Sequence, residues 1–142
     1  MSAGAALYMA VGLGSGLGAA ARYLCSLGAG AALGAGFPWS TLIVNGLGSF
    51  IIGFYATLSE PGGRLFPNPA LRHFVLTGFC GGFTTFSMFS LETLRLAQTK
   101  SLLFAGANVG GSLILWLFAA WTGHAIAQRI GRLRGGQSHE HV

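Results

Sequence analysis

Apolar residues fill four long stretches of this chain in which no Asp, Glu, Lys or Arg occurs. The stretches cover residues 1–21, 23–59, 73–91 and 101–128. A helix needs about 20 mostly apolar residues to cross the hydrocarbon core of a bilayer. The pattern therefore predicts four membrane-spanning helices, over residues 5–24, 40–58, 70–95 and 101–126.

The third span differs from the others because glycines and hydroxyl residues interrupt it, and residues 78–90 read GFCGGFTTFSMFS. Glycine weakens a helix by up to about 1 kcal/mol relative to alanine, and threonine hydroxyls compete for backbone partners. The pattern predicts a helix that is interrupted over residues 78–85 and resumes through residue 95. The alternative is a continuous helix whose glycines permit tight packing.

An interruption at membrane depth has a functional implication. Non-helical backbone is tolerated there only where it is buried in protein or lines a wet cavity. Carbonyl groups freed at such a break can coordinate a cation such as Na⁺. The interrupted segment is therefore where a functional site is expected.

The connections between spans are also readable. Glycines at 12, 14, 16 and 18 form two small-xxx-small pairs in the first span, which predicts close contact with another helix. A Gly/Ala-rich connector over 27–37 leads to Pro38-Trp39, and residues 59–69 form a polar loop. The short turn at 99–100 makes the third and fourth spans antiparallel neighbours. The chain thus divides into a four-helix membrane domain, residues 1–128, and a polar tail, residues 129–142.

Composition and charge support a membrane protein. Of 142 residues, 52% are hydrophobic and 8% charged, with a mean hydropathy of +0.62, whereas a soluble domain has roughly 25% charged residues. A water-soluble monomer is not expected on this basis. Two cysteines in or beside apolar stretches supply neither a disulfide framework nor a zinc site. The net charge of +5 comes from basic residues at helix ends, typical of membrane anchors rather than of nucleic-acid binding.

The basic residues fix the orientation in the membrane only weakly. The side with both termini carries Arg64, Arg72, Arg129, Arg132 and Arg134, and the other side carries Arg22, Arg95 and Lys100. This small difference permits insertion in both orientations. A chain of this length cannot easily enclose a pathway alone, so a dimer is expected.

Polar side chains form a stripe on two of the predicted helices. Thr41, Asn45, Gly48 and Ser49 share one face of the second span, and Asn108 and Ser112 share one face of the fourth. Polar groups are costly in hydrocarbon and face the bundle interior, a partner or water. The two stripes either line one groove or join helices through hydrogen bonds.

Two phenylalanines follow the predicted interruption. Phe86 and Phe89 are three residues apart, so their rings project to the same side of the resumed helix. The edge of a phenyl ring carries positive potential and can attract a small hard anion, assisted by neutral donors on Asn45, Thr41 and Ser112. The alternative is that both rings are ordinary core or lipid-facing residues.

Charged and titratable residues give no catalytic arrangement. Arg22 can raise the anion concentration at a pore mouth, and Glu92 lies near a helix end, although each could equally be a solvated helix-end residue. His73 and His124 lie at helix ends without carboxylate partners arranged for catalysis. An enzyme is not expected.

Residues 81–92, GGFTTFSMFSLE, resemble the signature of the Fluc (CrcB-like) fluoride channel family, whose pattern is close to GGxTTFSTFSxE. Residues 14–23, GSGLGAAARY, and residues 41–50, TLIVNGLGSF, are similar to the first and second helices of that family. The resemblance covers all four helices, and the third-helix motif is highly specific. Two departures are Met88, which replaces a small hydroxyl residue, and Trp116, where a small residue is commoner.

The resemblance implies an all-α membrane protein with four transmembrane helices per chain, a broken third helix and an antiparallel dual-topology homodimer. It implies two fluoride pores and a central structural Na⁺, held by the backbone carbonyls of Gly81 and Thr84. By motif position and helix matching, the fluoride pathway is assigned to Phe86, Phe89, Asn45, Thr41, Ser112, Asn108, Arg22 and Glu92.

The expected function is passive, fluoride-selective export of toxic fluoride from the cytoplasm across the cell inner membrane. The expected partners are fluoride, membrane lipid and a second copy of the chain, with no nucleic acid. Two rivals are a small multidrug-type dual-topology transporter and a structural membrane subunit. The first rival would carry a carboxylate on its first helix, but the first acid here is Glu60. The second would use the polar stripes and the phenylalanine pair for packing.

Overall fold

All regular secondary structure is helical over the residues that the computed structural model describes, which are 2–34, 36–60, 65 and 67–135. Three long helices are α1 (Ala3–Leu33), α2 (Trp39–Leu58) and α6 (Leu102–Gly135). The remaining span is built from α3 (Pro69–His73), the π-helix η1 (Phe74–Phe79), α4 (Cys80–Phe83) and α5 (Phe86–Thr99). The all-α prediction is confirmed.

Four segments are long and apolar enough to cross a membrane: Gly4–Leu33, Trp39–Leu58, Pro69–Thr99 and Leu102–Gly131. Between 11% and 33% of each apolar window is buried inside the chain. Most apolar side chains therefore face outward, as expected for helices that meet lipid or a partner rather than water. The protein is a multi-pass membrane protein.

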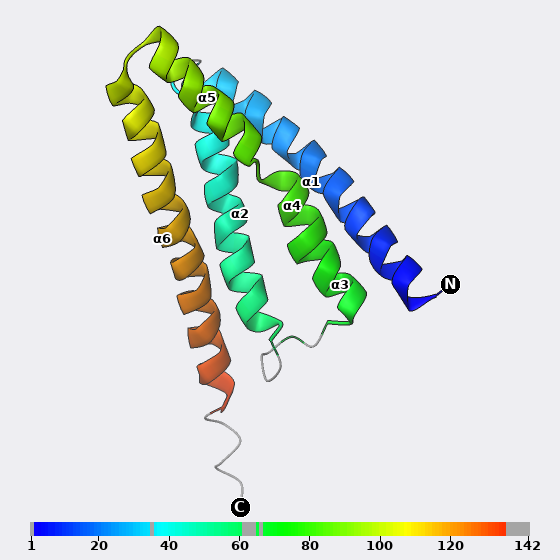
Figure 1. Cartoon of the computed structure of the whole chain (residues 1–142). Helices are drawn as coiled ribbons and strands as arrows, with labels where there is room; N and C mark the ends of the chain where they lie inside the picture. Colours follow the sequence, from blue (N-terminus) through cyan, green and yellow to red (C-terminus); the bar gives the residue numbers. More distant parts are fainter. Residues whose placement is uncertain (1, 35, 61–64, 66, 136–142) are drawn as a thin grey trace, which may run out of the picture.

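The helices run up and down in sequence order (Figure 1). The start of α1, the end of α2, the start of α3 and the end of α6 lie at one end of the bundle. The end of α1, the start of α2 and the turn from α5 to α6 lie at the other end. Helix α2 packs most extensively against α6, while α1 packs against η1 and α4. Helices α5 and α6 are also in contact, which confirms the predicted antiparallel neighbours.

Two helices extend beyond their predicted ends. Helix α1 continues to Leu33, through a segment expected to be a connector from residue 27, because alanine there supports a helix and no proline occurs before Pro38. Helix α6 continues to Gly135, past its predicted end at residue 126, because arginine is also a good helix former. The first part of the predicted polar tail, residues 129–135, thus belongs to α6, and residues 136–142 lie outside the described part of the chain.

The interruption of the third span is narrower than predicted. Residues Phe74–Phe83 remain helical through η1 and α4, and extended backbone occurs only at Thr84 (φ −81°, ψ 160°) and Thr85 (φ −151°, ψ 120°). The break expected over residues 78–85 therefore begins six residues later, at residue 84. The glycines before it have a different role.

Those glycines let the third span approach α1. A Cβ atom at Gly78 would lie 2.8 Å from the Val11 carbonyl oxygen, and one at Gly82 would overlap the Ser15 carbonyl oxygen. On α1, a Cβ atom at Gly14 or Gly18 would likewise overlap the backbone of η1. The predicted close contact of the 14/18 glycine pair is confirmed. The 12/16 pair has open space around it within the chain.

Candidate functional site

The break between α4 and α5 is held by a single side chain from another helix. Asn45 of α2 donates from Nδ2 to the Thr85 carbonyl oxygen at 2.9 Å and accepts the Thr85 N–H through Oδ1 at 2.7 Å. These two bonds satisfy both backbone groups of a buried residue that no longer has helical partners. Asn45 therefore fixes the extended conformation of the break.

Hydroxyl groups on both sides of the break complete its local structure. The Thr84 hydroxyl donates to the Cys80 carbonyl at 2.8 Å, and Thr84 N–H donates to the same oxygen at 2.9 Å, which closes the end of α4. The Thr85 hydroxyl accepts the Met88 N–H at 3.2 Å and caps the start of α5. The Thr-Thr pair thus ends one helix and starts the next.

The carbonyl group of Gly81 loses its usual partner at this point. In a continuing α-helix it would accept the N–H of the residue four positions later, Thr85. That N–H donates to Asn45 instead. The Gly81 carbonyl and the extended Thr84 carbonyl are the kind of unwound backbone oxygens that coordinate Na⁺ in other membrane proteins, so these residues fit the predicted cation.

The phenylalanine pair directly follows the break. The ring centroids of Phe86 and Phe89 are 5.6 Å apart, which confirms that the rings lie on the same side of α5. Phe86 is 73% exposed in the single chain, whereas Phe89 is 7% exposed. The Phe89 ring meets the Trp116 ring of α6 in a T-shaped contact with centroids 5.0 Å apart. Three aromatic rings therefore follow one another from the outer face of α5 to α6.

The polar stripes of α2 and α6 both face the bundle interior. Thr41 and Asn45 of α2 and Asn108 and Ser112 of α6 are all buried. Asn108 donates to the Thr93 hydroxyl at 2.8 Å, and Thr93 in turn donates to the Phe89 carbonyl at 2.7 Å. Asn45 and Asn108 thus join helices, as the hydrogen-bonding alternative for the stripes predicts.

Ser112 differs from Asn45 and Asn108. Its hydroxyl oxygen is buried and has no hydrogen-bond partner among the described residues.

Thr93 was missed by sequence reasoning, although its spacing of four residues from Phe89 places it on the same face of α5. It supports the backbone of Phe89 rather than the ring.

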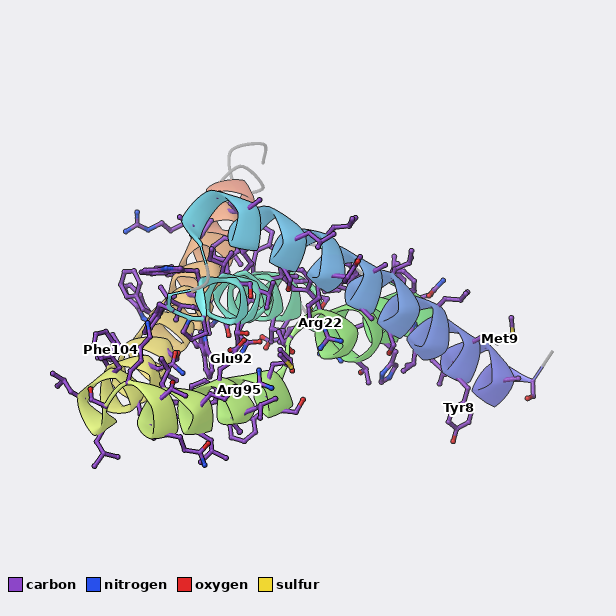
Figure 2. The ribbon with its side chains drawn as sticks, turned by 90° about the horizontal axis from the view of Figure 1, so that it is seen from above. Tyr8, Met9, Arg22, Glu92, Arg95 and Phe104 are labelled. Carbon is purple, nitrogen blue, oxygen red and sulfur yellow. The ribbon has the colours of Figure 1, made fainter. Side chains whose placement is uncertain are left out.

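A charged cavity lies on one side of the break, between α1, α2 and α5. Arg22, Thr41, Thr85, Ser87 and Glu92 are among its lining residues, and it is called the mouth cavity below. Figure 2 shows Arg22, Glu92 and Arg95 gathered near the centre of the view, far from Tyr8 and Met9 at the outer end of α1. The structure therefore brings Arg22, Glu92 and Thr41 together.

Glu92 also borders a second charged cavity, which Arg95 and Lys100 line. Its Oε2 atom is buried without a hydrogen-bond partner among the described residues. Lys100 donates to the Gly36 carbonyl and lies 5.6 Å from the centre of the Phe104 ring. Two basic residues, Arg95 and Lys100, thus share this cavity with Glu92.

A less polar cavity of about 200 Å³ lies on the other side of the break. Its lining residues, which define the aromatic cavity, are Asn45, Ser49, Ile52, Thr84, Thr85, Phe86 and Trp116. No charged side chain is among them. Thr85 lines both cavities, so the break stands between a charged mouth and an uncharged aromatic space. Phe89, Asn108 and Ser112 are buried beside these cavities without lining either one.

Comparison with known proteins places this arrangement in a family. The family model described as "CrcB-like protein, Camphor Resistance (CrcB)" matches residues 9–124. The chain is 52% identical over 131 residues to a protein of Rhodopseudomonas palustris named "Fluoride-specific ion channel FluC 1", covering 92% of this chain and 93% of the relative. It is 50% identical over 129 residues to "Fluoride-specific ion channel FluC" of Opitutus terrae, covering 91% and 98%. The matched residues include α2, the break and the phenylalanine pair, and the chain belongs to the CrcB-like family.

Proposed function

We propose that the chain forms a passive, fluoride-selective channel through which fluoride leaves the cytoplasm. Relatives that share about half of its residues are named fluoride-specific ion channels. The observation that carries the proposal is that two cavities meet at Thr85, one with Arg22 and the other with uncharged donors and an aromatic ring. Ion conduction needs no catalytic step, and the family is not one of enzymes.

The chemistry of the two cavities suits an anion that holds its water strongly. A pore must replace the hydration shell without binding the ion so tightly that it cannot leave. Arg22 concentrates anions at the mouth, and the Thr41 hydroxyl there offers a neutral donor. Beyond Thr85, the second N–H of the Asn45 amide and the Phe86 ring edge are weak ligands in a space without carboxylates. Because such ligands bind fluoride weakly, the ion can leave again, which favours conduction over tight binding.

The proposed driving force is electrochemical. Neutral HF crosses membranes and dissociates in the cytoplasm, where the fluoride ion is trapped unless a channel is present. An inside-negative potential contributes about 2.3 kcal/mol per 100 mV to the exit of one negative charge. The proposed channel therefore exports fluoride without a coupled ion or a chemical energy source.

The channel is proposed to be an antiparallel homodimer with two pores. Phe86 lies largely uncovered at the edge of the aromatic cavity, so a single chain leaves this cavity open on one side. A second copy inserted in the opposite orientation would close it, and the weak charge asymmetry of the chain permits that insertion. The carbonyl groups of Gly81 and Thr84 from both copies would hold one structural Na⁺ between the breaks.

Reconstitution of the purified full-length protein into liposomes tests the function. Vesicles loaded with fluoride should release it when a K⁺ ionophore clamps the potential, while vesicles loaded with chloride should retain chloride. Fluoride-selective electrodes measure the release. Protein-free vesicles provide the background, because HF leaks through lipid.

The rival functions give different results in the same assay. A structural membrane subunit would release neither anion, and a multidrug-type transporter would move an organic cation instead of fluoride. Equal release of fluoride and chloride would contradict the proposed selectivity.

A further inference from the structure

Trp116 has a buried N–H group for which the fold supplies no acceptor. Its Nε1 atom is buried and has no hydrogen-bond partner among the described residues. Tryptophan N–H groups usually find a partner when they are buried. An unpaired buried donor costs about 1–3 kcal/mol, so such a group in a well-packed protein calls for an explanation.

The position of the indole indicates what the missing partner is. Trp116 is one of the residues that line the aromatic cavity, together with Asn45, Thr85 and Phe86, so its buried indole lies at the wall of this cavity. Its ring is also fixed by the T-shaped contact with Phe89, which limits the directions that the N–H can take. An indole N–H can only donate, so it suits an anion and gives nothing to a cation.

A second unpaired donor lies on the same face of α6. The Ser112 hydroxyl is one helical turn before Trp116, and its oxygen is also buried without a partner among the described residues. Two neighbouring donors without acceptors are expensive in an apolar bundle unless a species other than the protein accepts from them.

We propose that the Trp116 indole N–H donates a hydrogen bond to fluoride in the aromatic cavity and is a specificity-determining contact of this channel. The inference rests on the proposed function. The Phe86 ring edge is a weak ligand, whereas an N–H bond to an anion is charge-assisted and roughly twice as strong as a neutral bond. A hydrogen bond from Trp116 thus replaces part of the hydration that fluoride loses on entering the aromatic cavity, whose lining residues carry no charge.

Flux measurements with matched tryptophan variants test the proposal. Trp116→Phe keeps an aromatic ring against Phe89 but removes the N–H. Trp121→Phe is the control, because Trp121 is on the same helix, is 62% exposed and packs against Phe118 outside both cavities. Trp116→Phe should lower fluoride efflux roughly tenfold, the loss expected for one hydrogen bond to a charged group, and Trp121→Phe should leave it unchanged.

Equal efflux from Trp116→Phe and the wild-type protein would overturn the proposal. That result differs from failure of the proposed function, in which the wild-type protein itself releases no fluoride. Size-exclusion chromatography shows whether each variant keeps the oligomeric state of the wild-type protein.

A second measurement keeps Trp116 in place, so its result does not depend on whether the Trp116→Phe variant folds. The double variant Trp39→Phe/Trp121→Phe leaves Trp116 as the single tryptophan, and its indole ¹⁵N–¹H resonance is then the only one in the spectrum. Sodium fluoride should shift this resonance in a saturable manner, and sodium chloride at the same concentration should not. An identical response to the two salts, or no response to either, would reject the contact.

Discussion

Phe86 and Phe89 are neighbours in space, but their surroundings give them different roles. Phe86 is exposed at the rim of the aromatic cavity, where its ring edge is accessible to an ion. Phe89 is buried under Trp116, and its carbonyl group accepts from Thr93. Within one chain, Phe89 is therefore a core residue, as the alternative interpretation of the pair predicts. The Phe86 ring is accessible from the aromatic cavity. Only flux measurements separate an ion contact from packing.

Replacing either ring by an aliphatic side chain should impair conduction. We expect Phe86→Ile and Phe89→Ile each to lower fluoride efflux at least tenfold, because isoleucine has no positive ring edge to offer an anion. Efflux from liposomes measures this effect. Phe89→Ile should also lower the free energy of unfolding by about 1 kcal/mol or more, because Phe89 is buried and its replacement alters the core packing.

The matched control is Phe118→Ile on α6. Phe118 is 59% exposed and pairs with Trp121 away from both cavities, so its loss should not alter efflux. If Phe86→Ile and Phe89→Ile both conduct like the wild-type protein, the two rings are packing residues and the proposed anion contact is wrong.

At the scale of elements, the third span depends on α2 for its shape. The break has no residue in a left-handed conformation, and glycine at the break is not what allows it, because Thr84 and Thr85 occupy ordinary extended regions. What holds it is the pair of hydrogen bonds from Asn45, forty residues earlier in the chain. The shape of one element is thus set by a side chain of another.

Asn45→Leu should therefore destabilise the break. The substitution leaves the buried N–H and C=O of Thr85 without their recorded partner, at a cost on the order of 2 kcal/mol or more. We expect an earlier thermal transition of the detergent-solubilised protein, and loss of efflux because the break reshapes both cavities. Circular dichroism during heating measures the first effect.

Ser49→Ala provides the comparison for Asn45→Leu. Ser49 lies one turn along the same face of α2, and within the described residues its hydroxyl makes no hydrogen bond to the break. This variant should unfold at nearly the wild-type temperature. Similar destabilisation by both substitutions would mean that cavity volume, rather than the Asn45 bonds, holds the break.

These contacts explain which features the sequence could predict. The four spans follow from local hydropathy, so they were predicted correctly, and the Thr-Thr break was placed within the expected segment. The exact start of the break was not predictable, because Gly78 and Gly82 resemble helix breakers but serve the contact with α1. The place of Trp116 was also beyond sequence reasoning, since only packing of α6 on α5 brings it to the Phe89 ring. Contacts between residues far apart in the sequence set the start of the break and the position of Trp116, and local helix propensity contains no information about such contacts.

At the scale of the whole molecule, several features of one chain fit the proposed assembly of two copies. Its spans expose apolar side chains on most faces, the aromatic cavity is open beside Phe86, and the exposed Gly81 contributes a carbonyl group without its helical donor. Lipid can cover the apolar faces, but it cannot satisfy backbone oxygens. In the proposed dimer, a second copy would face the first across a shared cation. The second copy would close the aromatic cavity, and the cation would bind the free carbonyl groups. Assembly and cation binding should therefore depend on each other.

Removal of Na⁺ tests this coupling directly. We expect fluoride efflux and the dimer fraction to fall when Na⁺ is replaced by choline at constant ionic strength, because choline is too large for a site made of backbone carbonyls. Adding Na⁺ back should restore both quantities, which separates loss of the cation from irreversible damage. Efflux from liposomes and chemical crosslinking in detergent provide the two measurements. Since the cation would join two copies, its removal should act more strongly at low protein concentration. Identical efflux and crosslinking in the two salts would reject the assignment of Gly81 and Thr84 to a structural sodium site.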